Sequence, residues 1–487
     1  MEWQRDRKGH ETTYEYDQYK RLVATRDEAS GITTFFNYNS LGNIIESGRH
    51  HDNGSTTIDQ TLAYDKNGQK TAIIDILGNQ TTMSTEIRPD GYEISKTTRP
   101  DQTTIIQITH PDGLEYESMG TGVWPTRNLY GANLQGAFST QVRLGVNGEA
   151  NEWITTYKDM LNRPYLTVYP NGAEVRNFYN NHGQLEKTVD PDGITTLYTY
   201  NELGECIETA LDMNRNGIID HNGTDQISKT VTDVVNRDDG TVVQRTRTWN
   251  WPKIHVDTPQ LITINESTLD GMHSWKTVNG LTTETQIKHQ DNGELATITT
   301  NPDGTRVISL SVHGKTISEI VYNANGEIVS GTWYRYDNWG LLTNISTTPS
   351  FTPEHTTTKT YDTSGQVTSI TTPDPDGDGP QSRQTTSYEY DNMGRVTKTI
   401  NPDQTTVIHT YHPTGEVSMT WGSRTYPIEQ KYEKGRQIRL ISWQDYSAKN
   451  SAAETTWDYD TQGHLIRKQY ADGKGPTYTY TPAGRIL

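Results

Sequence analysis

Short stretches in which apolar and polar side chains alternate run along the chain, separated by turn residues. Residues 388–404 show the pattern most clearly. Tyr388 and Tyr390 stand two positions apart, so both side chains face one side of an extended strand. Gly394 can adopt a positive φ at no steric cost, and Pro402 presets φ for a second turn. A second alternating stretch lies between these turns. This unit is therefore predicted to be a β-hairpin that can stack on copies of itself.

Copies of this unit recur through the sequence. The Tyr-x-Tyr-Asp half returns, with substitutions, at residues 14–17, 36–39, 198–201, 334–337, 457–460 and 478–481. Pro-Asp-Gly turns stand at residues 89–91, 111–113, 191–193 and 302–304. The glycine pairs 183/204, 394/415 and 463/484 are each separated by 21 residues. Such fixed self-similarity predicts a repeat architecture in which each unit packs only against its neighbours.

The combination of Tyr-x-Tyr-Asp-x-x-Gly-Arg with Pro-Asp-Gly resembles the YD repeat of the Rhs family, which includes bacterial toxin shells and the animal teneurins. The resemblance implies an all-β fold, in which antiparallel β-hairpins wind as a spiral β-sheet into a hollow shell or barrel. In toxin members the shell encloses a cytotoxic C-terminal segment, which an aspartyl self-cleavage domain releases. This sequence contains neither part, so it resembles a fragment of the shell wall alone.

We expect residues 1–487 to form one continuous repeat body, with two interruptions. The stretch 114–156 is rich in glycine and aromatic residues, and it can be a long loop or a strand pair with a decorated turn. The stretch 205–290 carries degenerate repeats, although 242–248 and 262–264 still alternate like strands. Both chain ends fall inside the repeat pattern, which suggests a piece of a longer protein.

The composition fits a thin wall. Apolar residues make up only 31% of the chain, less than a deep core requires. Alternating β-branched and aromatic residues nevertheless argue against disorder and favour half-buried strands. A single sheet with both faces partly exposed to water explains both the low apolar content and the alternating strand pattern.

Charge, cysteine content and hydropathy exclude several classes of partner, metal site and targeting segment. The net charge of −18 disfavours nucleic acid and anionic membranes. A lone cysteine, Cys206, excludes an intrachain disulfide and a zinc site built of thiolates. Residues 1–8 are too polar for a signal peptide, and no apolar run is long enough to span a bilayer. We therefore expect secretion or surface display only as part of a larger protein.

One local motif predicts a metal site. Residues 212–220 match the first part of an EF-hand calcium loop, with oxygen side chains at positions one, three, five and nine and glycine at six. The usual glutamate at position twelve is replaced by Gly223, though a carboxylate follows at 225. The candidate ligands of a structural Ca²⁺ are Asp212, Asn214, Asn216, Ile218 through its carbonyl, Asp220 and Asp225. The alternative is an ordinary polar hairpin tip. Residues 374–379 show the same first half but lack the later ligands.

Catalytic residues stay unknown from the sequence, because no recognised catalytic or phosphate-binding motif is present. We favour a non-catalytic wall that encapsulates or displays another polypeptide segment or a flanking domain. A polysaccharide lyase or hydrolase is one alternative, since tyrosine or histidine with arginine can act on an acidic sugar. A glycan-binding adhesive surface is another. Apart from calcium, no cofactor is expected.

Overall fold

The computed structural model describes residues 2–5, 11–28, 30–50, 54–252, 255, 257–290, 294–377 and 379–487. It contains 39 β-strands, and the described residues include a single 3-10 turn, Pro353–His355, and no α-helix. The strand pairings among the described residues are antiparallel and join strands that are consecutive in the chain. The predicted all-β array of antiparallel hairpins is confirmed.

The strands gather into two compact units. Unit 1 contains residues 1–84, 233–246 and 263–406, and unit 2 contains residues 85–232, 247–262 and 407–487. Each unit therefore holds an early and a late run of paired strands. We call these the first run and the second run of that unit.

Unit 1 contains the runs β1 to β8 and β22 to β33. The first run comprises β1 Glu2–Arg5, β2 Glu11–Tyr16, β3 Leu22–Asp27, β4 Ile32–Tyr38, β5 Ile44–His50, β6 Thr56–Tyr64, β7 Lys70–Asp75 and β8 Gln80–Ile87. The second run comprises β22 Gln260–Thr268, β23 His273–Val278, β24 Leu281–His289, β25 Leu295–Thr300, β26 Arg306–Val312, β27 Lys315–Tyr322, β28 Ile328–Tyr336, β29 Leu342–Ser346, β30 Thr356–Tyr361, β31 Val367–Thr371, β32 Thr385–Tyr390 and β33 Val396–Ile400.

Unit 2 contains the runs β9 to β20 and β34 to β39. The first run comprises β9 Glu93–Thr98, β10 Thr104–Thr109, β11 Glu115–Met119, β12 Thr126–Asn133, β13 Gly136–Arg143, β14 Glu152–Asp159, β15 Pro164–Val168, β16 Glu174–Tyr179, β17 Leu185–Val189, β18 Thr195–Tyr200, β19 Cys206–Asp212 and β20 Gln226–Asn236. The second run comprises β34 Thr406–Tyr411, β35 Val417–Gly422, β36 Thr425–Glu433, β37 Arg436–Asp445, β38 Asn450–Tyr459 and β39 Leu465–Gln469. Strand β21, Val242–Asn250, has residues in both units, and so do β8, β20, β22 and β34, which are assigned above to the unit that holds the rest of their run.

The two stretches that interrupt the sequence pattern also contain strands. Residues 114–156, for which a long loop and a strand pair were both open, include β11, the hairpin β12–β13 and the start of β14. Residues 205–290 include β19 to β24, and the alternating segments predicted there lie in β21 and β22.

The Tyr-x-Tyr-Asp turns share one pattern of hydrogen bonds, which the turn after β32 illustrates. In the turn after β32, the Asp391 side chain accepts hydrogen bonds from the backbone N–H groups of Met393 and Arg395, at 2.9 and 3.0 Å. Gly394 takes the positive φ of 78° that the turn requires. The preceding Tyr390 donates its hydroxyl to the carbonyl of Val367, which follows the previous such turn, at 2.7 Å. Each tyrosine thus ties its own hairpin to the one before it.

This tyrosine bond is general. The same hydroxyl-to-carbonyl bond is made by Tyr38, Tyr179, Tyr200, Tyr336, Tyr361, Tyr390, Tyr459 and Tyr480. An arginine of the previous turn can cover the ring, as Arg163 covers Tyr179 at 4.5 Å. Burial raises the pKa of Tyr179, Tyr200, Tyr336, Tyr361, Tyr390 and Tyr459. These recurring contacts stack the hairpins in register.

Antiparallel strands place successive turns alternately at their two ends, and so each run has two rims. The tyrosine rim carries the Tyr-x-Tyr-Asp turns, such as residues 180–184 and 460–464. The proline rim lies at the opposite strand ends and carries turns such as residues 190–194 and 401–405. Not every proline turn obeys this division: the turn at 110–114 lies on the tyrosine rim, as the register of β10 to β14 requires.

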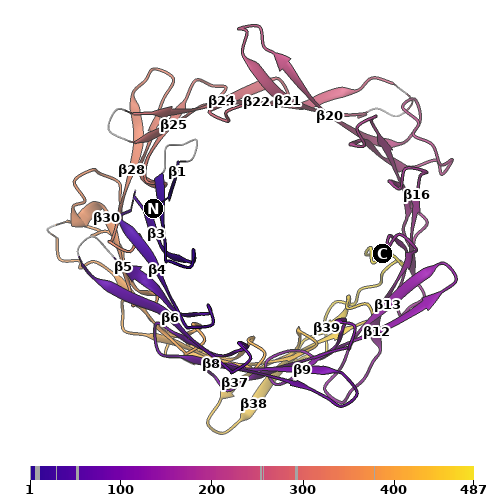
Figure 1. Cartoon of the computed structure of the whole chain (residues 1–487), viewed down its shortest axis with the longest axis horizontal. Helices are drawn as coiled ribbons and strands as arrows, with labels where there is room; N and C mark the ends of the chain where they lie inside the picture. Colours follow the sequence, from indigo (N-terminus) through magenta and orange to yellow (C-terminus); the bar gives the residue numbers. More distant parts are fainter. Residues whose placement is uncertain are drawn as a thin grey trace. The chain divides into compact units, whose positions relative to one another are not determined.

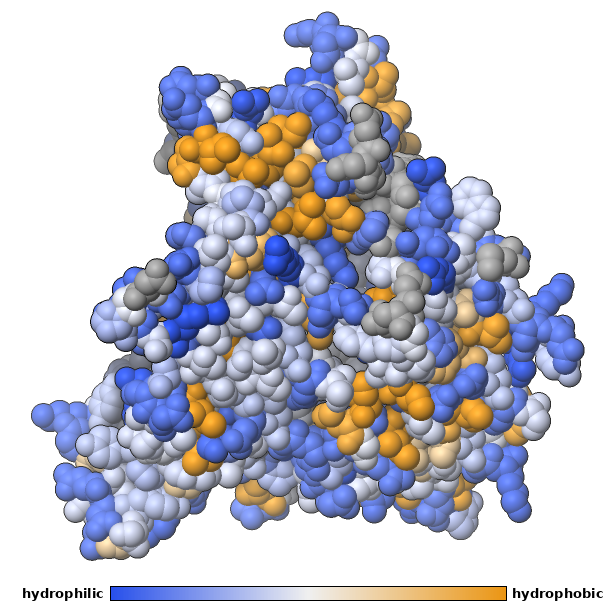
Figure 2. Space-filling model, turned by 90° about the vertical axis from the view of Figure 1, so that its left-hand side faces the viewer, coloured by the Kyte–Doolittle hydropathy of each residue, from blue (hydrophilic) through white to orange (hydrophobic). Residues whose placement is uncertain are grey.

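Little of the protein is deeply buried. The 55.0 kDa chain exposes 28358 Å², whereas a folded monomer of that mass exposes about 18,000 Å². One cluster of buried apolar side chains, Leu197, Ala210 and Ile227, lies in unit 2. Hydrophilic residues dominate the face seen in Figure 2, and the hydrophobic ones form separate patches. The excess of exposed surface is what a single sheet with two wet faces produces.

Candidate functional site

The predicted calcium loop connects β19 to β20. Asp212 ends β19, Asp225 precedes β20, and their residues are only 3% and 5% exposed. The Asp212 carboxylate accepts hydrogen bonds from the backbone N–H groups of Asn216 and Gly217, at 3.2 and 2.9 Å. Asp225 accepts them from Met213 and Asp220, both at 3.0 Å. Within the described part of the chain, neither carboxylate has a basic partner.

The remaining side chains of the motif converge on the same loop. Both Asn214 and Asn216 place their amide nitrogen 2.6 Å from Oδ2 of Asp220. Gly217 takes a φ of 81°, as the sharp bend in a calcium loop requires. Rotating either amide would present an oxygen instead, which is the ligand that a hard cation needs. Ile218, at position seven, is exposed, and its backbone N–H donates to Asn216 Oδ1 at 3.0 Å.

Whether the donor set fits a cation can be judged from the charges. Two nearly buried carboxylates without a basic partner place negative charge in the loop, and a bound cation would balance it. The oxygens available are carboxylates, amides and a carbonyl, which suit Ca²⁺ better than a transition metal. Among the described residues, no group of three or more His, Cys, Asp or Glu side chains gathers at metal-binding distance. A site here therefore depends on its asparagine and carbonyl oxygens.

A charged cluster supports the base of this loop. His221 lies 3.4 Å from Glu208, and the Lys229 ammonium lies 2.9 Å from the same carboxylate. Burial acts to raise the pKa of Glu208, but the hydrogen bond and charge of Lys229 outweigh it and hold the pKa below its usual value. The His221 ring also packs against Trp251 at 4.9 Å. The ion pairs of Glu208 and the contact of His221 with Trp251 therefore hold the loop between β19 and β20 in place.

The second candidate loop is simpler. Asp374 accepts the backbone N–H of Asp376 at 3.3 Å, and Asp376 accepts that of Gln381 at 3.1 Å. These are ordinary turn contacts. Residue 378 of this motif lies outside the described residues.

The structure also brings together residues that sequence reasoning did not single out. In unit 2 the proline rim of the first run meets the tyrosine rim of the second run. The Lys434 ammonium lies 2.8 Å from Asn151 Oδ1 and 3.1 Å from Glu152, and Arg436 also binds Glu152. The Lys434 side chain is 6% exposed and that of Glu152 is 12% exposed. Burial acts to raise the pKa of Glu152, but the hydrogen bonds from Arg436 and Lys434 prevail and lower it.

Two neighbouring contacts join the same rims. The indole N–H of Trp124 donates to Glu416 at 2.6 Å. Gln462 donates its side-chain amide to Asn171 at 2.8 Å, so a Pro-Asn-Gly turn touches a Tyr-x-Tyr-Asp turn. Burial acts to raise the pKa of Glu416, yet hydrogen bonds from Thr414 and Trp124 leave it lowered.

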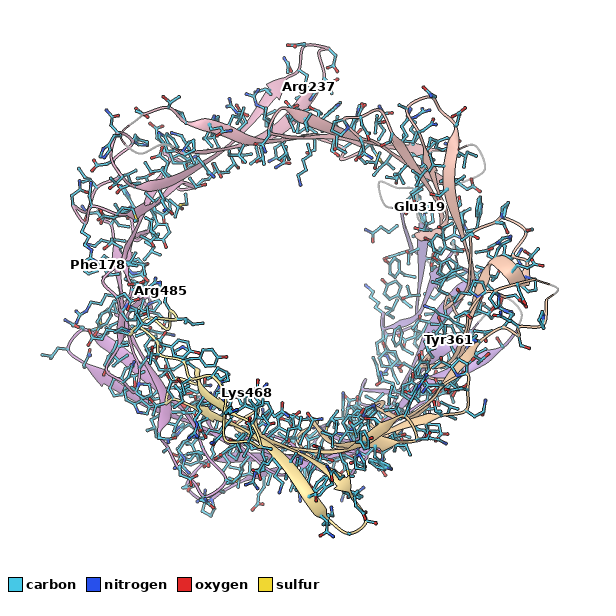
Figure 3. All side chains as sticks on the ribbon, turned by 180° about the vertical axis from the view of Figure 1, so that it is seen from behind. Phe178, Arg237, Glu319, Tyr361, Lys468 and Arg485 are labelled. Atoms are coloured by element: carbon cyan, nitrogen blue, oxygen red, sulfur yellow. The ribbon has the colours of Figure 1, made fainter. Side chains whose placement is uncertain are left out.

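A fourth contact lies at the turn that contains Pro191. Asp192 accepts the Thr481 hydroxyl at 2.7 Å and the backbone N–H of Ala483 at 3.1 Å. Arg485, labelled in Figure 3, bridges Asp190 and Asp192. A Pro-Asp-Gly turn of the first run is therefore held by hydrogen bonds and ion pairs from a Tyr-x-Tyr turn of the second run.

Unit 1 repeats the arrangement. The Arg49 guanidinium, at the proline-rim end of β5, lies over the ring of Trp339 at 5.0 Å, and Trp339 stands in a turn of the tyrosine rim. Figure 1 shows β5 beside β30. A cavity of about 480 Å³ lies here, lined by Arg49, Trp339 and Tyr361 among others. Tyr361, labelled in Figure 3, donates its hydroxyl to the carbonyl of Leu342 at 2.6 Å.

One sequence separation describes all of these contacts. The hydrogen bonds between rims in unit 2 join residues 282 to 295 positions apart, and Arg49 and Trp339 in unit 1 are separated by 339 − 49 = 290 positions. The shared value shows that both units superimpose their runs with the same sequence offset. No local motif signals this, because each partner residue looks like an ordinary turn residue in the sequence.

Comparisons with known proteins yield distant structural likenesses. No family model matches the chain, and no curated protein matches it. A crystal structure of TcdB2-TccC3-TEV is similar at 12% identity and a TM-score of 0.32, over 98% of this chain and 34% of that one. A Tc holotoxin pore of Photorhabdus luminescens is similar at 13% identity and a TM-score of 0.31, over 98% and 34%. The chain thus spans about a third of the length of these solved chains, and likenesses this weak carry no argument about function.

Proposed function

We propose that this chain is a non-catalytic wall of a β-shell of the Rhs type, which encloses or displays another polypeptide segment of a larger secreted or surface protein. The single observation that carries the proposal is the rim contact. In each unit, a later run of hairpins adheres to an earlier run by the turns of the repeat itself. A sheet that adheres to itself at a constant offset can extend without a conventional core.

Two further properties support a wall. The exposed surface far exceeds that of a compact monomer. The rim contacts are polar and tie turns together, whereas enzymes usually gather their catalytic groups in an enclosed apolar pocket. None of the described helical structure is long and apolar enough to cross a membrane.

Small-angle X-ray scattering tests the proposal directly. A compact protein of 487 residues has a radius of gyration of about 23 Å. A wall around a cavity places its mass far from the centre, so we expect a clearly larger radius and a distance distribution weighted toward long distances. A radius near the compact value would refute the wall.

We also propose that residues 212–225 bind a structural Ca²⁺. The buried Asp212 and Asp225 carboxylates without a basic partner support this. The ion would hold the long connection between β19 and β20 against its anchoring cluster. It would serve stability rather than chemistry.

Glycan binding is the second candidate function, and the cavity in unit 1 favours it. Trp339 and Tyr361 line that cavity together with several threonine hydroxyls. Incubating the purified chain with acidic polysaccharides separates the alternatives. Unsaturated or shortened products would indicate an enzyme, and binding without turnover would indicate an adhesive surface. A wall is expected to give neither result.

A further inference from the structure

The tyrosine rim of the first run in unit 2 exposes a row of large apolar side chains at four of its turns, and the polar turn at 180–184 lies between the last two of these. Its members are Leu114, Leu134, Met160, Leu161 and Leu203. Leu134 is 99% exposed and Leu203 is 85% exposed. Scattered surface leucines need no explanation, but a row along one rim marks an interaction surface. The equivalent rim of the second run, which is covered by the first run, shows no such row among its described turns.

Comparing equivalent turn positions makes the contrast sharper. In the second runs, the third residues Trp339 and Gln462 of two Tyr-x-Tyr-Asp turns contact the first run of their unit. In the second runs this position is half-buried at Trp339, Met393, Thr414, Gln462 and Ala483, with Ser364 the exception. In the first runs it is exposed at Tyr19, Leu41, Asn67, Leu161, His182 and Leu203. The same turn position is therefore covered in one run and free in the other.

The opposite free rim has a matching character. On the proline rim of the second run of unit 2, Tyr426 is 75% exposed and Tyr470 is 45% exposed. This rim is of the kind that already meets a tyrosine rim inside the unit, through contacts such as Gln462 with Asn171. The chain thus presents both halves of an interface that it also forms internally.

We propose that the free tyrosine rim of unit 2 is a docking surface for a second copy of this chain, which binds it through the free proline rim of its own second run. The interface continues the one seen within unit 2 and buries the apolar row. It is heterologous, with different surfaces on the two copies, so association is head to tail and can add further copies. The proposal does not depend on what the wall encloses.

Sedimentation velocity of the purified chain tests the interface, at about 1 and about 100 μM, the range in which weak protein contacts saturate. We expect the mean mass to at least double over that range. A tyrosine-rim variant carrying Leu134→Asp, Leu161→Asp and Leu203→Asp should stay monomeric. Leu129→Asp, at an exposed mid-strand position of β12, is the matched control and should associate like the original. Circular dichroism should show all of them folded.

Mixing two variants distinguishes this geometry from other dimers. The proline-rim variant, Tyr426→Asp with Tyr470→Asp, should also be monomeric alone. Because each variant keeps the half that the other lost, an equimolar mixture should form dimers and stop there. A chain that stays monomeric at both concentrations, or an association that survives the tyrosine-rim substitutions, overturns the proposal. So does a mixture that remains monomeric.

Discussion

Replacing Glu152 by glutamine probes the contact between the two rims of unit 2. The substitution preserves side-chain size but removes the charge that balances Lys434 and Arg436. The Lys434 side chain is 6% exposed, so its ammonium would keep Asn151 as a partner but lose its counter-charge. Removing one partner of a buried ion pair costs about 3 kcal/mol or more. Part of the Arg436 charge can still reach water, which places the expected loss near the lower end.

Hydrogen exchange by mass spectrometry measures this loss where it occurs, since a chain of two units need not unfold in one step. A loss of about 3 kcal/mol corresponds to roughly a hundredfold faster exchange in the turn at 434–436. Glu174→Gln is the control, because its exposed pair with Arg176 should contribute less than about 1 kcal/mol. The double variant with Lys434→Met should recover part of the protection. Equal effects of the two single substitutions would refute the reasoning.

Four other measurements follow from the structure. Tyr390→Phe deletes the bond to Val367, and urea unfolding should show a loss of about 1 kcal/mol; no loss would remove the tyrosine bond as a cause of register. Because the pKa values of Glu152 and Glu416 are lowered in the folded chain, their contribution to stability is present above the ordinary glutamate pKa and is lost as the pH falls below it. Acid should therefore separate the two rims of unit 2 and speed hydrogen exchange at 434–436. Exchange there that does not respond to acid would contradict this. Burial raises the pKa of Tyr361 in the folded chain. Its contribution to stability is therefore complete below the tyrosine pKa of the unfolded chain and is lost above it, so circular dichroism at alkaline pH should show unfolding. Finally, excess Ca²⁺ at about a hundred times Kd should stabilise the chain by about 2.7 kcal/mol; Asp225→Asn should abolish that gain, and a melting temperature unchanged by chelator would exclude a structural ion.

The candidate calcium loop illustrates what sequence reasoning can reach. The spacing of Asp212, Asn214, Asn216 and Asp220 is a local property, and a local motif is visible in the sequence. The burial of Asp212 and Asp225 is not, because it depends on how the neighbouring strands pack around the core cluster, against which Trp251 lies from the connection after β21. The rim residue Glu152 carried no motif at all.

The sequence by itself determined the hairpin. Alternating side chains, the tyrosine that reaches back one repeat and the glycine that accepts a positive φ are all set within about one repeat of chain. Only the tertiary structure decided which turns meet, because residues about 290 positions apart are aligned by twist and curvature summed over many strands. A small change in the twist or curvature of each hairpin would add up over these strands and bring a different pair of turns together. The number of strands that precede a turn likewise fixes its rim, which is why the proline turn at 110–114 lies among the tyrosine turns.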